Sequence, residues 1–185
     1  MSKIDPVRIL TKYYSPDSKS YHFLIHHSMM VAEKALKIAQ NVKGLGPDMD
    51  FIREASILHD IGIFLTDEPG IGCQGDKPYI CHGYLGREIL EKEGLPLHAL
   101  VCERHVGVGL TIQDIEENNL PIPIRDMMPV SLEEKIICLA DKFFSKDSEF
   151  LLKEKPLGHV RKTISKFGDE KLGRFDEWLR LFGNS

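Results

Sequence analysis

The sequence lacks a long apolar run, and no stretch approaches the roughly 18 residues that a membrane-spanning helix requires. Its first residues, Met1 to Asp5, lack the apolar core of a secretory signal. Basic residues are not in excess, because 24 Lys and Arg stand against 28 Asp and Glu. This balance argues against general nucleic-acid binding, which needs a basic face. We therefore expect a cytoplasmic protein that does not act at a membrane.

Cysteine is sparse, and no two cysteines form a Cys-x-x-Cys pair. We expect reduced, mostly buried thiols at the four positions, Cys73, Cys81, Cys102 and Cys138. Internal repeats and low-complexity linkers are absent, and strand-like alternation is nearly absent. With 42% hydrophobic residues, the 185-residue chain is long enough for one compact domain. The fold class expected is all-α.

Caps and breakers divide the chain into helices. Asp5-Pro6 and Ser18 are N-terminal signals, Thr111 with Asp114 is a weaker one, and Ser131-x-x-Glu134 is a capping box. The expected helices are about 6–13, 18–42, 51–61, 79–93, 96–105, 111–118, 131–145, 157–167 and 169–182. We predict a single domain over 1–185, with a core of about 18–146 and the C-terminal helices 157–182 packed on it. The long loop 66–78 is a candidate lid.

Polar side chains with metal-ligand chemistry lie on the apolar faces of five expected helices. In the second helix, for example, His27 falls on the same stripe as Leu24 and Val31, whereas His22 and His26 fall off it. The residues placed in this way are His27, His59, His82, His105 and Asp141. A single buried histidine is explained by hydrogen bonding, but a buried aspartate needs a partner or a metal. Five such residues directed to one core predict a metal site.

His59 is followed directly by Asp60, and neighbouring helical positions differ by about 100°. The two side chains can reach one ion from two sides, or Asp60 can bridge two ions while His59 serves one. Gly62 is expected to end the helix close to the site. Imidazole and carboxylate donors favour one or two divalent ions, with iron or manganese first and cobalt, nickel or zinc as alternatives.

The order of these motifs resembles the HD-domain metal-dependent phosphohydrolases, in the HDIG subgroup. The resemblance covers about Tyr21 to Ser145 and depends on three runs: His27-Ser28-x-x-Val31-Ala32, Leu58-His59-Asp60-Ile61-Gly62 and Leu139-Ala140-Asp141. It implies a compact helical bundle with the metal site in its core. By this resemblance one ion takes His27, His59, Asp60 and Asp141, and the other takes Asp60, His82 and His105.

The chain departs from one branch of that family. Enzymes of this type that cleave cyclic dinucleotides carry a Lys shortly after the His-Asp pair and a His-His-Glu run later. Here Phe64 follows Ile63, and His105 lies between Arg104 and Val106. Cleavage of cyclic dinucleotides is therefore not expected. The insertion 66–78 also differs from the shortest family members and could shape a different pocket.

The resemblance implies hydrolysis of a nucleotide or related small phosphate ester by a metal-activated water. Asp60 and Asp141 are the expected catalytic residues, with Asp60 holding both ions and Asp141 orienting the nucleophile. Arg104 and Lys146 are candidate substrate-binding cations, although each is equally well explained as a solvated surface charge. The expected partner is a small phosphate-bearing molecule.

Two other functions stay open at this stage. The first is a di-iron oxygenase of the HD type, because such enzymes use a similar set of His and Asp ligands. The second is a non-catalytic sensor or interaction module, which usually loses ligands that are all present here. A homodimer is also possible through the apolar positions of the last helix, although packing on the core of the same domain is favoured. These positions are Phe175, Trp178, Leu179, Leu181 and Phe182.

Overall fold

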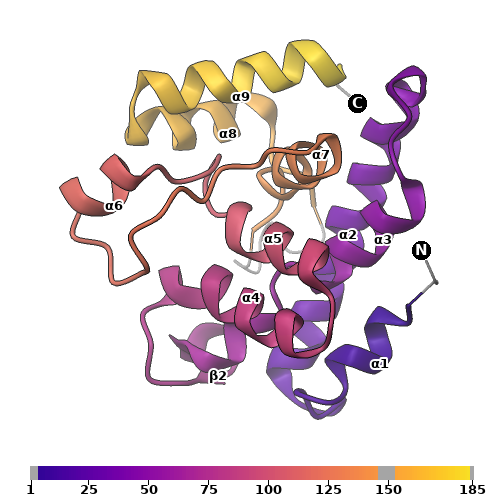
Figure 1. Cartoon of the computed structure of the whole chain (residues 1–185), viewed down its shortest axis with the longest axis vertical. Coiled ribbons are helices and arrows are strands. Elements are labelled where there is room, and N and C mark those ends of the chain that lie inside the picture. Colours follow the sequence, from indigo (N-terminus) through magenta and orange to yellow (C-terminus); the bar gives the residue numbers. More distant parts are fainter. Residues whose placement is uncertain (1–3, 146–152, 184–185) are drawn as a thin grey trace.

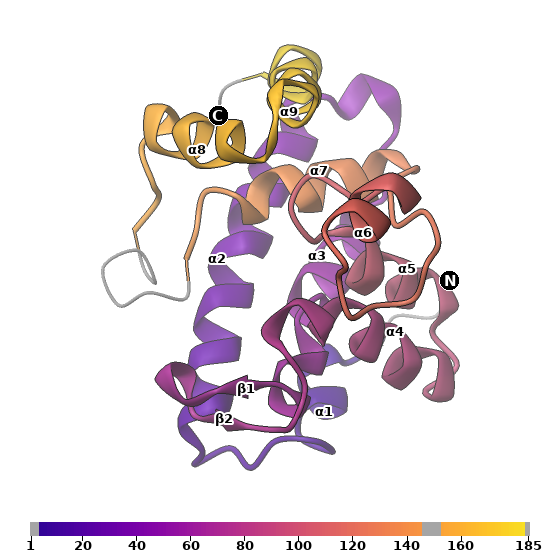
Figure 2. The ribbon, with the colours of Figure 1, turned by 90° about the vertical axis from the view of Figure 1, so that its left-hand side faces the viewer.

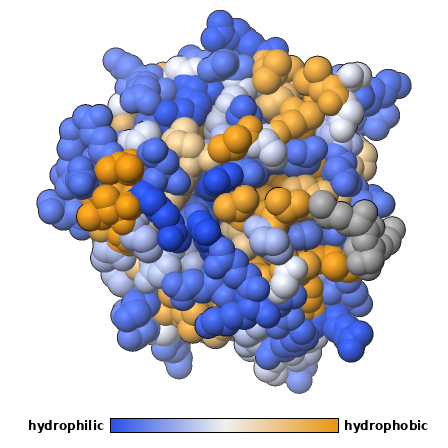
Figure 3. Space-filling view, viewed as in Figure 1, coloured by the Kyte–Doolittle hydropathy of each residue, from blue (hydrophilic) through white to orange (hydrophobic). Residues whose placement is uncertain are grey.

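The computed structural model of the chain is a bundle of helices, with a single two-stranded sheet among the residues it describes, 4–145 and 153–183 (Figure 1). The all-α class predicted from the sequence is therefore confirmed. Among these residues, no helix is both long enough and apolar enough to cross a membrane. Hydrophilic residues cover much of the face shown in Figure 3, with smaller hydrophobic patches between them.

The long helix α2 (Lys19–Asn41) runs along the bundle from the hairpin to the C-terminal helices, as Figure 2 shows. The side-chain oxygen of Ser18 caps it by accepting a hydrogen bond from the Tyr21 backbone amide at 3.1 Å. Its apolar stripe is buried, and His27 lies on that stripe with 1% of its surface exposed. His22 and His26 are exposed. The helical periodicity of the sequence thus predicted the correct inward face.

Two helices pack on α2 and extend this core. They are α3 (Met49–Leu58) and α7 (Leu132–Asp141), and the short helix α1 (Pro6–Leu10) lies against α3. Asp5, Asp48 and Ser131 cap α1, α3 and α7, respectively, through their side chains. A short 3₁₀ helix, Lys43–Leu45, connects α2 to α3.

The helices α4 (His82–Lys92) and α5 (Pro96–Arg104) form an adjacent pair. Two 3₁₀ helices, Ile61–Leu65 and Tyr79–Cys81, connect α3 to this pair. The helix α6 (Ile112–Glu117) follows and has the reciprocal capping box between Thr111 and Asp114. The C-terminal ends of α3, α5 and α7 and the N-terminal end of α4 therefore come together between the α2, α3 and α7 group and the α4–α5 pair.

The C-terminal helices α8 (Leu157–Ile164) and α9 (Asp169–Phe182) cover one end of the bundle, with a 3₁₀ turn, Ser165–Phe167, between them (Figure 1). Phe175, Trp178 and Phe182 are buried in the core shared with α2 and α7, whereas Leu181 is 52% exposed. The apolar face of the last helix therefore packs on its own domain, as favoured from the sequence. Whether the chain forms a homodimer stays a prediction.

Three local expectations were wrong. The segment 66–78 is not only loop, because it contains a hairpin of β1 (Asp67–Glu68) and β2 (Cys73–Gln74) around a 3₁₀ turn, Pro69–Ile71. The third helix ends at Leu58 rather than near Ile61, so Gly62 lies inside the following 3₁₀ helix and does not end α3. The helix after Ser131 ends at Asp141 rather than near Ser145.

Two smaller corrections concern side chains. Helical periodicity places Leu97 on the same face of α5 as Val101 and predicts its burial, but Leu97 is 44% exposed because it lies in the first turn of the helix, beside an open cavity. The capping box at Ser131 is only half formed, since the Glu134 carboxylate accepts from the Val130 amide and from Arg104 instead. The expectation for cysteine holds: all four are free and buried, and burial raises the pKa of Cys138 to about 12.

Candidate metal centre

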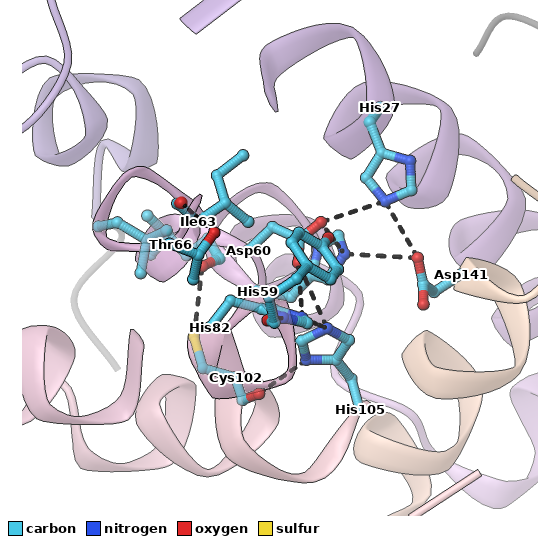
Figure 4. Close-up of polar contacts among 12 residues, drawn as sticks. His27, His59, Asp60, Ile63, Thr66, His82, Cys102, His105 and Asp141 are labelled. Atoms are coloured by element: carbon cyan, nitrogen blue, oxygen red, sulfur yellow. Dashed lines mark hydrogen bonds and ion pairs between the residues drawn. The ribbon is translucent and has the colours of Figure 1, made fainter. Parts of the chain in front are cut away.

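All six predicted ligands converge on one point between α2, α4 and α7 (Figure 4). Only His27 projects from the middle of a helix, α2. The other five occupy helix ends: His59 and Asp60 just after α3, His82 at the start of α4, His105 just after α5 and Asp141 at the end of α7. Four different helix ends and one helix face therefore build the site.

Gly62 allows the segment with His59 and Asp60 to lie against α4. A Cβ atom at this position would be 2.3 Å from the carbonyl oxygen of His82 and 2.5 Å from the amide nitrogen of Gly86. Such distances are far below van der Waals contact, so only glycine fits. Gly62 thereby brings Asp60 and His82 close together, a different role from the helix stop expected.

One carboxylate oxygen of Asp60 faces two histidines. Its Oδ2 lies 3.3 Å from Nε2 of His27 and 3.3 Å from Nε2 of His59. Asp141 completes this side, because its Oδ1 is 3.0 Å from Nε2 of His27 and 3.6 Å from Nε2 of His59. The ligand atoms of His27, His59 and Asp141 all lie within 4.8 Å of one another, which suits a shared metal ion.

The other oxygen of Asp60 faces a second pair of histidines. Its Oδ1 is 3.3 Å from Nε2 of His82 and 3.4 Å from Nε2 of His105. The two Nε2 atoms are only 3.1 Å apart. Asp60 is fully buried, and each of its two carboxylate oxygens faces a different pair of histidines. The ligand atoms of His59, Asp60 and His105 also lie within 4.8 Å of one another.

Backbone carbonyls fix the orientation of three of these rings. The Nδ1 atoms of His59, His82 and His105 lie 2.6, 2.6 and 2.7 Å from the carbonyl oxygens of Ser56, Tyr79 and Cys102, each three residues earlier. A carbonyl only accepts, so each Nδ1 carries the proton and donates it. Nε2 of the neutral ring is then the atom with the free electron pair, and it points into the site. Metal-binding histidines are oriented in the same way, so these residues fit a divalent metal ion.

The charges of the site are strongly coupled. Burial alone would lower the pKa of His59, but the carboxylates of Asp60 and Asp141 raise it to about 10. Burial lowers the pKa of His105. Burial alone would raise the pKa of Asp141, but Lys142 and His27 hold it well below its usual value. The fully buried carboxylate of Asp60 and the mostly buried carboxylate of Asp141 therefore attract positive charge into this cluster, as a protonated imidazole or as a metal ion.

Sequence reasoning missed Lys142, which supports this site directly. Its Nζ is 2.8 Å from Oδ2 of Asp141 and 3.0 Å from the carbonyl oxygen of His105, and its side chain is 13% exposed. The ammonium thus holds one oxygen of Asp141 and leaves the other directed at His27. Its position immediately after Asp141 was the available signal, but adjacency alone does not show which way a side chain points.

Replacing Lys142 by Met is expected to weaken metal binding by about 10- to 100-fold, because Asp141 would lose the contact that orients it. Titration of the metal-free protein with Mn²⁺ measures this affinity, and Lys142→Arg is expected to restore part of it. Lys135→Met, on α7, is the control. Tighter binding in Lys142→Met would show instead that removing a positive charge outweighs the loss of orientation.

The structure does not place Arg104, one of the two candidate cations for substrate, in the site. Nη1 of Arg104 contacts the Glu134 carboxylate at 3.0 and 3.1 Å. Arg104 also does not line the cavity of about 610 Å³ that opens beside His27 and Asp141. Lys146 lies outside the described residues. A role of either residue in binding substrate stays a prediction.

The comparison with protein families agrees with this geometry. The model of the HD domain family matches residues 24–145, and the chain belongs to this family. HD domains are typically metal-dependent hydrolases, and the His and Asp cluster found here fits a divalent metal. Membership of the HDIG subgroup stays a prediction.

Individual relatives are similar over different parts of their length. An uncharacterized protein of Methanocaldococcus jannaschii is 36% identical over 121 residues, which cover 64% of each chain. A tRNA (cytidine(56)-2'-O)-methyltransferase of Thermoplasma volcanium is 28% identical over 172 residues, 92% of this chain but 44% of that protein. The enzyme of the same name in Picrophilus torridus is 30% identical over 132 residues, 71% of this chain and 34% of its own. The chain thus spans less than two thirds of each of these relatives, and no solved structure matches it significantly.

Proposed function

We propose that the protein is a metal-dependent phosphohydrolase that holds two divalent ions and acts on a small phosphate ester. The observation that carries this proposal is the orientation of the Asp60 carboxylate. Its Oδ2 faces His27 and His59, while its Oδ1 faces His82 and His105. A carboxylate that presents each oxygen to a different pair of imidazoles suits a bridging ligand. Asp141, whose Oδ1 lies 3.0 Å from Nε2 of His27, would add a fourth ligand on that side.

The residues around the ions have separable tasks. His27, His59, Asp60 and Asp141 would hold one ion, and Asp60, His82 and His105 the other. Bound divalent ions supply a water made acidic enough to act as a nucleophile, together with positive charge for the phosphate oxygens. Asp141 is 13% exposed and lines the neighbouring cavity, so it lies where the buried ligands meet a substrate. No serine or cysteine nucleophile is needed.

The relatives support a nucleotide-like phosphate as the substrate. Two of them are named for a reaction on tRNA, and this chain matches less than half of each. A module of this type is therefore found within proteins that act on a polynucleotide. The net charge of −4 favours a small nucleotide or RNA-derived phosphate over a long polyanion.

Phosphate release from a panel of phosphate esters tests the proposal. We expect the metal-free protein to be inactive, and protein loaded with Mn²⁺ or Fe²⁺ to release inorganic phosphate without O₂. The metal content should reach two ions per chain. Binding of metal without phosphate release from any ester would contradict the proposal. Turnover that requires O₂ and a mixed-valent iron pair, detected by electron paramagnetic resonance, would favour an oxygenase instead.

A further inference from the structure

Three side chains on one face of α2 lead away from the metal centre. His27, Phe23 and Lys19 follow one another at intervals of four residues, which is about one helical turn each. All three line the same cavity of about 610 Å³, and Asp141 shares its inner end with His27. At a rise of about 1.5 Å per residue, Phe23 lies about 6 Å and Lys19 about 12 Å along the helix from the metal ligand.

The insertion hairpin forms the facing wall of this cavity. Ile71 from its turn and Tyr79 from the following 3₁₀ helix line it, and the ring of Tyr79 stacks on His82 with ring centroids 4.6 Å apart. Phe144, three residues beyond the end of α7, also lines the cavity. With Phe23, these residues surround the space next to the ligands with apolar and aromatic surface.

The hairpin is fixed over the outer end of this face. Gly72, at φ +82°, lies so close to α2 that a Cβ atom there would be 2.9 Å from Cβ of Lys19. Figure 2 shows the hairpin strands crossing the N-terminal half of α2. The contact places the turn of the hairpin beside Lys19, so the cavity has a defined outer end as well as a defined metal end.

Lys19 and Glu68 offer unused charges at that outer end. Neither side chain makes an ion pair or a hydrogen bond within the described residues, although both line the cavity. An ammonium there attracts acceptor atoms of a ligand, and a carboxylate accepts hydrogen bonds from hydroxyl or amino groups. In order from the candidate metal centre, the cavity thus presents His27 and Asp141, an aromatic section and a polar end.

We propose that this cavity binds the nucleoside part of a nucleoside monophosphate, so that the proposed phosphohydrolase acts on this class of substrate. The inference rests on the proposed function. The phosphate would lie at His27 and Asp141, the base against Phe23, and the far edge of the base near Lys19. Glu68, at the same outer end, would accept from an amino group at the far edge of the base. The cavity volume falls in the range of pockets for one small ligand, about 300–1,000 Å³.

Binding of AMP and ribose 5-phosphate to the full chain loaded with Ni²⁺ or Zn²⁺, whichever releases no phosphate from these esters, tests the proposal without relying on activity when it is measured by isothermal titration calorimetry. AMP is expected to bind about tenfold or more tightly than ribose 5-phosphate, because only AMP carries a base to stack. Phe23→Leu should weaken AMP about fivefold and leave ribose 5-phosphate unchanged. Lys19→Met should weaken AMP about threefold or more, with a smaller loss at high salt.

Matched variants separate these effects from general ones. Lys37→Met removes another cation from α2, and Phe167→Leu changes an aromatic residue that is 74% exposed. Both should bind AMP as the wild type does. Equal affinity for AMP and ribose 5-phosphate, or unchanged AMP affinity in both cavity variants, would overturn the proposal. Selective AMP binding without hydrolysis under any metal would support the cavity assignment and contradict only the proposed function.

Discussion

Replacement of Asp60 by Asn is expected to remove bound metal and to lower phosphate release by about 10³-fold or more. The substitution keeps the shape of the side chain but turns one of its two oxygens into an amide nitrogen, which cannot bind a cation. Because Oδ1 and Oδ2 face different histidine pairs, either orientation of the amide would leave one pair without its shared oxygen. Metal content by mass spectrometry and phosphate release by a colorimetric assay measure the two effects.

Asp76→Asn is the matched control for this variant, because the Asp76 side chain is 84% exposed. It should keep the metal content and the activity of the wild type. Circular dichroism should show that Asp60→Asn retains the helical fold. If Asp60→Asn kept two ions per chain, Asp60 would not be a bridging ligand.

Replacement of Gly62 by Ala is expected to lower the free energy of unfolding by about 3 kcal/mol or more. The new methyl group would meet backbone atoms, the His82 carbonyl at 2.3 Å and the Gly86 amide at 2.5 Å, which cannot move as a flexible side chain can. Relief of the clash requires α4 to move away from Asp60. We therefore expect weaker metal binding together with a lower midpoint of urea unfolding.

Gly158→Ala is the matched control, because the same substitution is expected to raise the free energy of unfolding at this position. Gly158 lies inside α8, and a Cβ atom at this position would have no heavy atom within 4 Å. Alanine is the better helix former, so this variant should be more stable by about 0.5–1 kcal/mol. A Gly62→Ala protein as stable as the wild type would show that the backbones of the two segments are not tightly packed.

Helical periodicity predicted which faces are buried where a helix is long. The stripe through His27 is an example, because α2 repeats its pattern over several turns. The same reasoning failed for Leu97, since α5 is a helix of 9 residues and its first turn borders an open cavity. The hairpin was missed because each strand has 2 residues, too few for an alternating pattern.

The convergence of the ligands was predictable from the sequence, but their orientation was not. The carbonyls that hold the rings of His59 and His105 belong to the last turns of α3 and α5, where carbonyl groups lack partners within the helix. Which carbonyls are available depends on where each helix ends, and element boundaries are what sequence patterns locate least well. Lys142 escaped notice for the same reason, because it lies just beyond the end of α7.

If the site holds the proposed ions, the location of their ligands at the ends of several helices also links the amount of folded protein to the metal supply. Residues from 27 to 141 of the chain contribute ligands, so an unfolded chain offers no comparable site. An ion present at about 100 times its dissociation constant adds about 2.7 kcal/mol to the free energy of unfolding. In a cell short of metal, the chain would lose this protection against proteolysis. The abundance of the protein would then fall together with its activity.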